Sequence, residues 1–260
     1  MFNIIFPENI GQYYWRIHYE YILNMFKYLE CSITYEHRGM EELRVTINDK
    51  DFIFDYWNDC NKILDTNLPV FKFHCIKETD KIFAFPTVTF YDWNQYYELK
   101  SKINYKAKGY IIYRQRAYGR STERRNKVKE ALSALKNVKI GTIEQLDYWN
   151  EVNKCLVSIH VPGFCNNSLD RGQLQLMAFG CCTISPYLPE ILPFGHSVTP
   201  GVHYIQCKDD YTNLTELINY CNNNTEKCLD IGNNAKQLFN HSSDVTSLSE
   251  WIEEKLCTLD

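Results

Sequence analysis

The sequence lacks the short motifs that mark several common enzyme classes. Its 260 residues contain no GxxxxGK[ST] phosphate loop, no HExxH zinc helix and no GxGxxG dinucleotide turn. Each motif places particular backbone or side-chain groups on a phosphate or a metal ion. Their absence argues against P-loop phosphoryl transfer, zinc-dependent hydrolysis and NAD chemistry, and we expect no metal site and no cofactor.

Cysteine pairs at metal-binding spacing and long apolar runs are also missing. The 11 cysteines are scattered, odd in number and without a CxxC pair, so neither a zinc site nor a disulfide framework is indicated. No window approaches the roughly 20 apolar residues that a membrane span needs. We therefore expect a soluble, cytoplasmic protein with reduced thiols and no integral membrane segment.

A global excess of positive charge is absent as well. The formal net charge is -4, so no basic field attracts nucleic acid and we expect no nucleic-acid partner. Aromatic residues, in contrast, are abundant and make up 15% of the chain. That abundance fits either a carbohydrate-handling surface or a coding bias toward Tyr, Asn, Ile and Lys, and composition alone favours the bias.

Apolar patterns predict an α/β protein with two lobes. The first lobe combines strands near residues 2–6, 43–47, 51–57, 70–74 and 82–86 with helices over 14–29 and 93–102. From residue 109 strands and helices alternate, which is typical of a doubly wound parallel sheet: strands at 109–115, 138–141, 156–161, 181–186 and 203–207, helices at 121–136, 142–155, 169–179, 214–222 and 225–239.

These patterns also predict the domain organisation. We expect an N-terminal lobe over residues 1–105 and a C-terminal lobe over 106–245. A last helix is expected within 246–260, and its Trp251 and Leu256 need a surface to pack on, which the N-terminal lobe could offer. No repeat or low-complexity linker separates the lobes, so they should be joined tightly.

Residues 157–186 are the most informative segment for function. An apolar strand leads into a turn that contains Phe164 and Asn167, and Ser168 is expected to open a helix with Arg171 in its first turn. Backbone N–H groups and the helix dipole attract phosphate at such a helix start, and a planar guanidinium suits a diphosphate. The spacing equally allows an Asn or Ser helix cap with a solvated arginine.

A second strand, turn and helix start lies over residues 113–125 and contains five arginines. A solvated helix face readily explains Arg124 and Arg125. Arg114, Arg116 and Arg120, in contrast, lie at or beyond the carboxyl end of a strand, where open α/β sheets bind ligands. Two anion-binding turns in one lobe would suit a diphosphate.

Acidic residues of the first lobe supply candidate bases. Asp55 closes an apolar strand and Asp59 follows shortly after it, so either carboxylate could take a proton from an attacking hydroxyl if it faces a cleft. A single exposed aspartate more often caps a turn. Asp92, and Glu190 of the predicted C-terminal lobe, are weaker candidates for the same role.

Four stretches, in this order, resemble the family of capsule-type β-xylosyltransferases and Rumi-type protein O-glucosyltransferases. Residues 69–93 are similar to its P-x-F-S-F-S-K segment and the D-I-x-x-P-x-W stretch after it, and residues 113–125 to its F-R-G, R-T-S and E-R. Residues 164–184 are similar to its S-x-R turn and leucine-rich helix, and residues 199–218 to its P-x-x-H-Y-x-x-V and D-L-x-D-L run. The resemblance covers roughly residues 52–220.

The resemblance implies a GT-B fold, in which two Rossmann-like lobes flank a cleft. It also implies an inverting, metal-independent glycosyltransferase that moves a sugar from a UDP-sugar to a hydroxyl of a glycan or glycoprotein acceptor. Xylose is the first expectation for the sugar and glucose the second. Arg120 with Ser121, and Ser168 with Arg171, match the family's two phosphate-binding pairs.

The resemblance also implies a base, and the sequence departs from the family at two points. Asp55 matches the family's base, but Trp57 stands where the family has proline, which leaves Asp55 and Asp59 both open. Gln115 stands where the family's F-R-G has glycine, next to Arg114.

Two other functions would use the same features. A nucleotide- or carbohydrate-binding module without catalytic activity would keep the arginine turns and would not need Asp55. A sugar-nucleotide hydrolase would hold the donor in the same way with water as the acceptor, although no metal-ligand cluster accompanies it.

Overall fold

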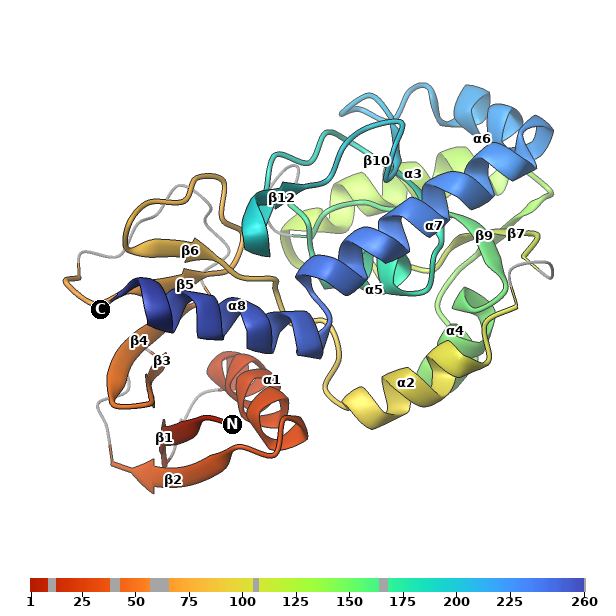
Figure 1. Ribbon diagram of the computed structural model, residues 1–260. Coiled ribbons are helices and arrows are strands. Elements are labelled where there is room, and N and C mark those ends of the chain that lie inside the picture. The colour runs from red at the N-terminus through yellow and green to blue at the C-terminus, as the bar shows by residue number, and fades with distance from the viewer. Residues whose placement is uncertain (9–12, 38–42, 57–65, 105–107, 164–167, 260) are drawn as a thin grey trace. The chain divides into compact units, whose positions relative to one another are not determined.

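The chain folds into two compact α/β units (Figure 1). A computed structural model describes residues 1–8, 13–37, 43–56, 66–104, 108–163 and 168–259. Unit 1 comprises Met1–Asn94, Glu190–Ser197 and His241–Asp260, and unit 2 comprises Gln95–Pro189 and Val198–Asn240. The N-terminal unit therefore also includes two segments from late in the chain.

Unit 1 is built on a six-stranded mixed sheet in the order β2-β1-β3-β4-β5-β6. Its strands are β1 (Asn3–Pro7), β2 (Ser32–Glu36), β3 (Leu43–Ile47), β4 (Lys50–Asp55), β5 (Val70–Lys72) and β6 (Ile82–Ala84). β3 runs antiparallel to both β1 and β4, and the other neighbours pair in parallel. The carboxyl ends of every strand except β3 therefore lie along one edge of the sheet.

Aromatic side chains form much of the core of unit 1. Helix α1 (Tyr13–Tyr28) buries Tyr21, Ile22, Met25 and Phe26 at helical spacing. The Phe71 ring of β5 stacks on both Phe52 and Phe54 of β4, with 5.1 Å between ring centroids in each pair. Phe26 of α1 meets Phe54 edge to face. The sequence's many phenylalanines are thus used for packing in this unit.

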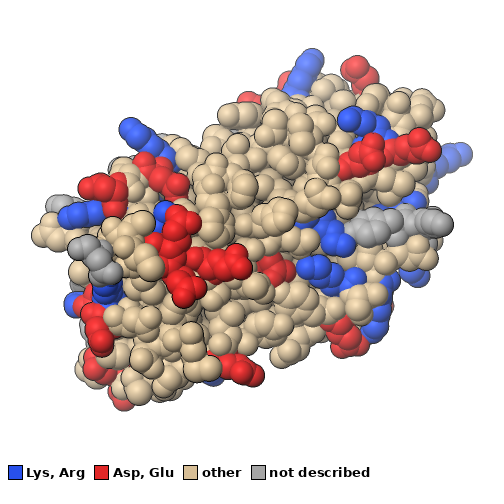
Figure 2. Space-filling view, viewed as in Figure 1, with Lys and Arg blue, Asp and Glu red and all other residues tan. Residues whose placement is uncertain are grey.

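The C-terminal segments complete unit 1. Helix α8 (Val245–Thr258) is the last helix expected from the sequence, and its Trp251 Nε1 donates to the Ala84 carbonyl of β6 at 3.0 Å. Residues 190–197, which also belong to unit 1, form β11 (Ile191–Leu192), the short 3-10 helix η3 (Pro193–Gly195) and β12 (His196–Ser197). Figure 2 shows acidic side chains gathered over α8, where Glu250, Glu253 and Glu254 are exposed.

Unit 2 is built on a five-stranded sheet in the order β13-β10-β9-β7-β8, and every neighbouring pair is parallel. Its strands are β7 (Tyr110–Tyr113), β8 (Val138–Ile140), β9 (Cys155–Ile159), β10 (Cys182–Ser185) and β13 (Ile205–Gln206). Its helices are α3 (Thr122–Ser133), α4 (Gln145–Val152), α5 (Arg171–Ala178) and α6 (Leu214–Asn223). The 3-10 turn η2 (Gly119–Ser121) directly precedes α3. Helices α2 (Trp93–Ser101) and α7 (Thr225–Ser242) lie mostly in this unit.

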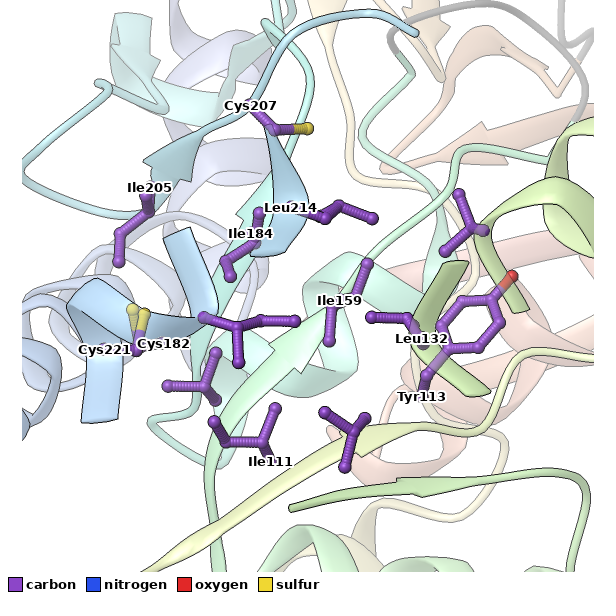
Figure 3. Close-up of a cluster of buried hydrophobic side chains, with 14 of the residues drawn as sticks. Ile111, Tyr113, Leu132, Ile159, Cys182, Ile184, Ile205, Cys207, Leu214 and Cys221 are labelled. Atoms are coloured by element: carbon purple, nitrogen blue, oxygen red, sulfur yellow. The ribbon is translucent and has the colours of Figure 1, made fainter. Parts of the chain in front are cut away.

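Helices pack on both faces of the unit 2 sheet. Figure 3 shows one side of the core, where Ile111 and Ile159 of the strands face Leu132 of α3 and Leu214 of α6. Because strand side chains alternate, Thr183 of β10 points to the other face. There Gln173 of α5 donates from Nε2 to the Thr183 hydroxyl at 2.6 Å.

The predicted α/β class is confirmed by these two sheets and their helices. The nine cysteines among the described residues are free thiols. The sequence patterns did not indicate β2, β11 or β12, which are short or exposed and have weak apolar alternation. None of the described helices is both long enough and apolar enough to cross a membrane.

Candidate functional site

The order of the strands in unit 2 creates a natural ligand-binding position. Numbered along the chain, the strands run 2-1-3-4-5, with β7 and β9 adjacent in the middle. The chain leaves β7 toward β8 on one side and leaves β9 toward β10 on the other. Loops that separate in this way leave a crevice at the carboxyl ends of the strands, where open α/β sheets bind their ligands. Both arginine turns found in the sequence follow these two strands.

The loop after β7 turns sharply into α3. Gly119 has a φ of 56°, a conformation that glycine adopts without steric cost, and the 3-10 turn η2 leads directly into the helix. The Ser121 side chain is buried and its hydroxyl donates to the Tyr118 carbonyl at 2.9 Å, so Ser121 helps to build this turn. Arg120 is exposed at the beginning of the helical segment.

The loop after β9 enters α5 two residues later than the sequence indicated. Helix α5 begins at Arg171, and Asp170, rather than Ser168, is its N-cap. The Asp170 side chain accepts a hydrogen bond from the Gln173 backbone N–H at 3.2 Å, and a carboxylate caps a helix at least as well as a hydroxyl. Ser168 is buried, whereas Arg171 is exposed in the first turn.

Asp170 is half-buried and is also the centre of a polar network that the sequence reasoning missed. His160, which follows β9, lies with Nε2 2.8 Å from Asp170 Oδ1 and with Nδ1 3.1 Å from the Ser185 hydroxyl of β10. The Gly163 N–H donates to Asp170 Oδ2 at 3.1 Å. Asp170 therefore ties the beginning of the loop to its end. The Asp-x-x-Gln spacing of residues 170 and 173 was the available signal, because it resembles a capping box.

The charge state of Asp170 follows from these neighbours. Burial alone would raise the pKa of its carboxyl, but the charge and hydrogen bond of His160, with Arg125 3.8 Å away, hold that pKa well below its ordinary value. The carboxylate is therefore ionised at any physiological pH, and it balances part of the positive charge of Arg125.

We expect Asp170→Asn to lower the free energy of unfolding at pH 7 by about 1–3 kcal/mol, because buried donors lose a charged acceptor. The pKa in the folded state lies below the unfolded value of about 3.9, so this stabilisation is complete above that pH and declines as the pH falls through it. Urea unfolding at pH 7 and pH 3 should show the deficit of the variant shrinking by about 1 kcal/mol. Asp209→Asn, at an exposed position, is the control. An unchanged deficit at pH 3 would contradict the assignment.

Three arginines of the segment 113–125 hold the loops together. Arg114, predicted to contact the donor, makes a two-pronged ion pair with Glu151, its Nε and Nη2 lying 2.6 and 2.9 Å from the carboxylate oxygens. Its Nη1 donates to the carbonyls of Ile140 and Gly141. Arg114 thus joins β7, β8 and α4, and we assign it a structural role.

Arg124 and Arg125 correct the expectation of a solvated helix face. Arg125 is buried, and it donates from Nη1 to the Arg116 carbonyl at 2.7 Å and from Nη2 to the Val161 carbonyl at 3.0 Å. Arg124 Nη2 donates to the Pro162 carbonyl at 2.7 Å. The loops after β7 and β9 are therefore both anchored to α3.

Gln115 adds a direct bond between the same two loops. Its side-chain oxygen accepts a hydrogen bond from the Val161 N–H at 2.6 Å. A glycine at this position, as in the family that the sequence resembles, could not make this bond. The departure from that family's pattern therefore has a structural use in this chain.

Unit 1 places its polar candidates at the carboxyl ends of β4 and β5. Asp55 and Lys72 are directly opposite in the sheet register, both are buried, and the Lys72 ammonium lies 2.9 Å from the Asp55 carboxylate. His74 Nδ1 lies 3.0 Å from Glu190 Oε1, and both side chains are buried. Asp55 therefore lies at the predicted strand end and already has a cationic neighbour.

Comparison with known proteins decides the fold. A glycosyltransferase from Rickettsia africae is similar with a TM-score of 0.53 and 12% sequence identity, over 97% of this chain and 84% of that one. The chain has a GT-B-like fold. Anabaena HepE in complex with UDP aligns with a TM-score of 0.46 and 16% identity, over 68% of this chain and 57% of HepE.

Sequence comparison adds little to this fold similarity. No protein-family model matches the chain. Uncharacterized protein 179R of Invertebrate iridescent virus 6 is 27% identical over 90 residues, which is 32% of this chain and 8% of that protein. The chain thus spans a small part of this relative and little more than half of HepE.

Within the GT-B-like fold, the predicted site residues other than Arg114, which is paired with Glu151, fall into three groups. Arg120, Ser121, Ser168 and Arg171 are brought to the same edge of the unit 2 sheet, after β7 and β9. Asp55 belongs to unit 1. Asp59, Phe164 and Asn167 lie outside the described residues. Among the residues that the structure describes, no three His, Cys, Asp or Glu side chains are grouped to hold a metal ion.

Proposed function

We propose that this chain is a glycosyltransferase that moves a sugar from a UDP-sugar to a hydroxyl of a glycan or glycoprotein acceptor. One observation carries the proposal. Two exposed arginines, Arg120 and Arg171, stand at the beginnings of helical segments on either side of the β7/β9 switch point. The GT-B-like fold supports the same function by analogy with the glycosyltransferase from Rickettsia africae.

The chemistry of this position suits a diphosphate. A helix N-terminus carries partial positive charge and backbone N–H groups, and a guanidinium adds a full charge with paired donors. Arg125 donates hydrogen bonds to backbone carbonyls of both loops, so Arg120 and Arg171 extend from loops whose backbone is held in place. Asp170 satisfies the Gln173 N–H itself, and we therefore assign the phosphates to the guanidinium groups more than to the backbone of α5.

In the proposed reaction, a base in unit 1 removes the proton of the acceptor hydroxyl. The oxygen attacks the anomeric carbon from the face opposite the leaving UDP, so the configuration inverts. Charge that develops on the diphosphate is offset by Arg120 and Arg171, in a metal-independent reaction. Of the two candidate bases, Asp55 lies among the residues that the structure describes and Asp59 does not. General base catalysis typically increases the reaction rate about 10²–10⁴-fold. Xylose is the first expectation for the sugar and glucose the second, as the family resemblance implies.

One observation favours a second candidate function. The Asp55 carboxylate is buried in an ion pair with Lys72, so a contact within unit 1 already engages it. A chain in which Asp55 serves only this ion pair would bind the nucleotide without transferring sugar. That alternative is a nucleotide-binding module on a glycosyltransferase fold.

A panel of donors distinguishes the two functions. The full chain should release UDP slowly from UDP-xylose or UDP-glucose by hydrolysis in the absence of acceptor, and faster when a hydroxyl acceptor is supplied. GDP-sugars should release no GDP. A coupled assay for free nucleoside diphosphate measures both. UDP binding without release from any donor would support the binding module, and absence of both would contradict the proposal.

A further inference from the structure

Tyr118 is an unusual surface residue because of its exposure and its place. Of the exposed large hydrophobic side chains among the described residues, it is the most exposed aromatic, with 63% of its surface accessible. It precedes Gly119 and Arg120 in the loop after β7, beside the switch point of the unit 2 sheet. Single exposed aromatics are ordinary, so position and support must decide whether this one has a function.

The Tyr118 ring is supported from inside the protein. The guanidinium carbon of Arg125 lies 5.2 Å from the ring centroid, a cation–π distance, and Arg125 is itself buried. Arg125 is fixed in turn by hydrogen bonds to the Arg116 and Val161 carbonyls. The Tyr118 backbone is held as well, because its carbonyl accepts the buried Ser121 hydroxyl. The ring is thus a preorganised surface with one face covered and much of the remainder accessible.

We propose that Tyr118 is the platform on which the nucleobase of the donor stacks. This inference rests on the proposed function and identifies the part of the site that holds the base. Every nucleobase has an apolar π-face that stacks on an aromatic ring, whereas a phosphate or a lone hydroxyl gains nothing from one. A ring fixed on a buried arginine loses little conformational freedom when it is covered.

The spacing along the loop agrees with a nucleotide. Tyr118 and Arg120 are two positions apart with Gly119 between them, which is at most about 7 Å of chain. The ribose of a nucleotide spans a similar gap between base and phosphates. With the base on Tyr118, the phosphates reach Arg120 and the beginning of α3. The loop after β7 would then contact the base and the phosphates, and the loop after β9 would contact the phosphates through Arg171.

The test compares two ligands that differ in the base. Tyr118→Ala should weaken UDP binding about 5- to 150-fold, the usual effect of removing one base–aromatic stack. It should leave the affinity for inorganic pyrophosphate within about twofold of wild type, because no stacking is lost. Tyr118→Phe keeps the ring and should bind UDP like wild type. Tyr220→Ala removes another exposed tyrosine of unit 2, on α6, and is the matched control.

Calorimetric titration of the full-length wild type and variants measures their affinities for UDP and for pyrophosphate. UDP affinity unchanged in Tyr118→Ala would overturn the proposal while leaving the proposed function intact. Equal losses of UDP and pyrophosphate would also overturn it, since they would show that the ring only supports Arg125. A wild-type protein that does not bind UDP would refute the proposed function and this inference together.

Discussion

Lys72→Met should destabilise unit 1 by about 3–5 kcal/mol, one of the largest effects that a single substitution in this chain can have. The Lys72 ammonium and the Asp55 carboxylate are 2.9 Å apart in the interior, with only 4% and 1% of their side-chain surfaces accessible. Removing the ammonium leaves a carboxylate in a poorly hydrated site. The free energy of unfolding in urea, followed by circular dichroism, measures the loss.

Asp55→Asn should be destabilising for the same reason, because it leaves the buried ammonium of Lys72 without its carboxylate. The double variant Asp55→Asn with Lys72→Met removes both charges and should recover much of the stability, since no unpaired charge is left and a neutral amide is less costly to bury than a carboxylate or an ammonium. Single and double variants that are all within about 0.5 kcal/mol of wild type would show that the pair contributes little to the fold.

This ion pair also determines how the role of Asp55 as a base must be tested. Lost activity in Asp55→Asn alone has two causes, a missing base and a destabilised unit. The double variant separates them, because it restores the fold without restoring a base. If Asp55 is the base, the double variant should be folded, should bind UDP and should transfer no sugar. Transfer by the double variant would move the base to Asp59 or to another residue.

Arg120→Ala and Arg171→Ala should each weaken UDP binding about 10- to 150-fold, because a charge-assisted hydrogen bond to a phosphate is worth about 1.5–3 kcal/mol. Both residues are exposed at the carboxyl edge of the unit 2 sheet, and circular dichroism of each variant checks that the fold is kept. The two substitutions together should weaken binding more than either alone. Titration of each variant with UDP gives the comparison.

Arg116→Ala is the matched control for these two variants. Arg116 is an exposed arginine of the same loop, and the contact that anchors it to Arg125 uses its backbone carbonyl, which the substitution keeps. Its UDP affinity should remain within about threefold of wild type. An effect as large as that of Arg120→Ala would indicate a diffuse basic surface in place of a built site.

Local patterns were sufficient to predict the parallel sheet of unit 2. Its strands are short apolar runs flanked by polar turns, and its helices carry regular apolar spacing, so each element is specified by its own residues. The same patterns placed Arg120 and Arg171 after β7 and β9. The GT-B-like fold was implied only by the resemblance, which combines four weak motifs in a fixed order.

The features that could not be predicted from the sequence depend on contacts between residues that lie far apart in the chain. Arg125 has the neighbours of a surface residue in sequence, and it is buried because Val161 and Arg116 present carbonyls to it. Residues 190–197 group with unit 1, where the Ile191 N–H bonds to the Cys75 carbonyl and Glu190 meets His74. Such pairings appear only when the fold is known.

The position of the helix cap illustrates a smaller error with a clear cause. Ser168 and Asp170 are both good N-caps, and the pattern of an apolar strand followed by a polar turn led to the prediction that the helix opens at Ser168. Asp170 prevails because its carboxylate also bonds His160 and the Gly163 N–H, contacts that a serine hydroxyl could not all make.

The most direct test of the whole account is a calorimetric titration of UDP into the wild-type chain, first with EDTA present and then with Mg²⁺. With the diphosphate on Arg120 and Arg171, UDP should bind with one-to-one stoichiometry in EDTA, and added Mg²⁺ should change the affinity little. No binding in either condition, or binding that requires Mg²⁺, would contradict a donor site built from these arginines.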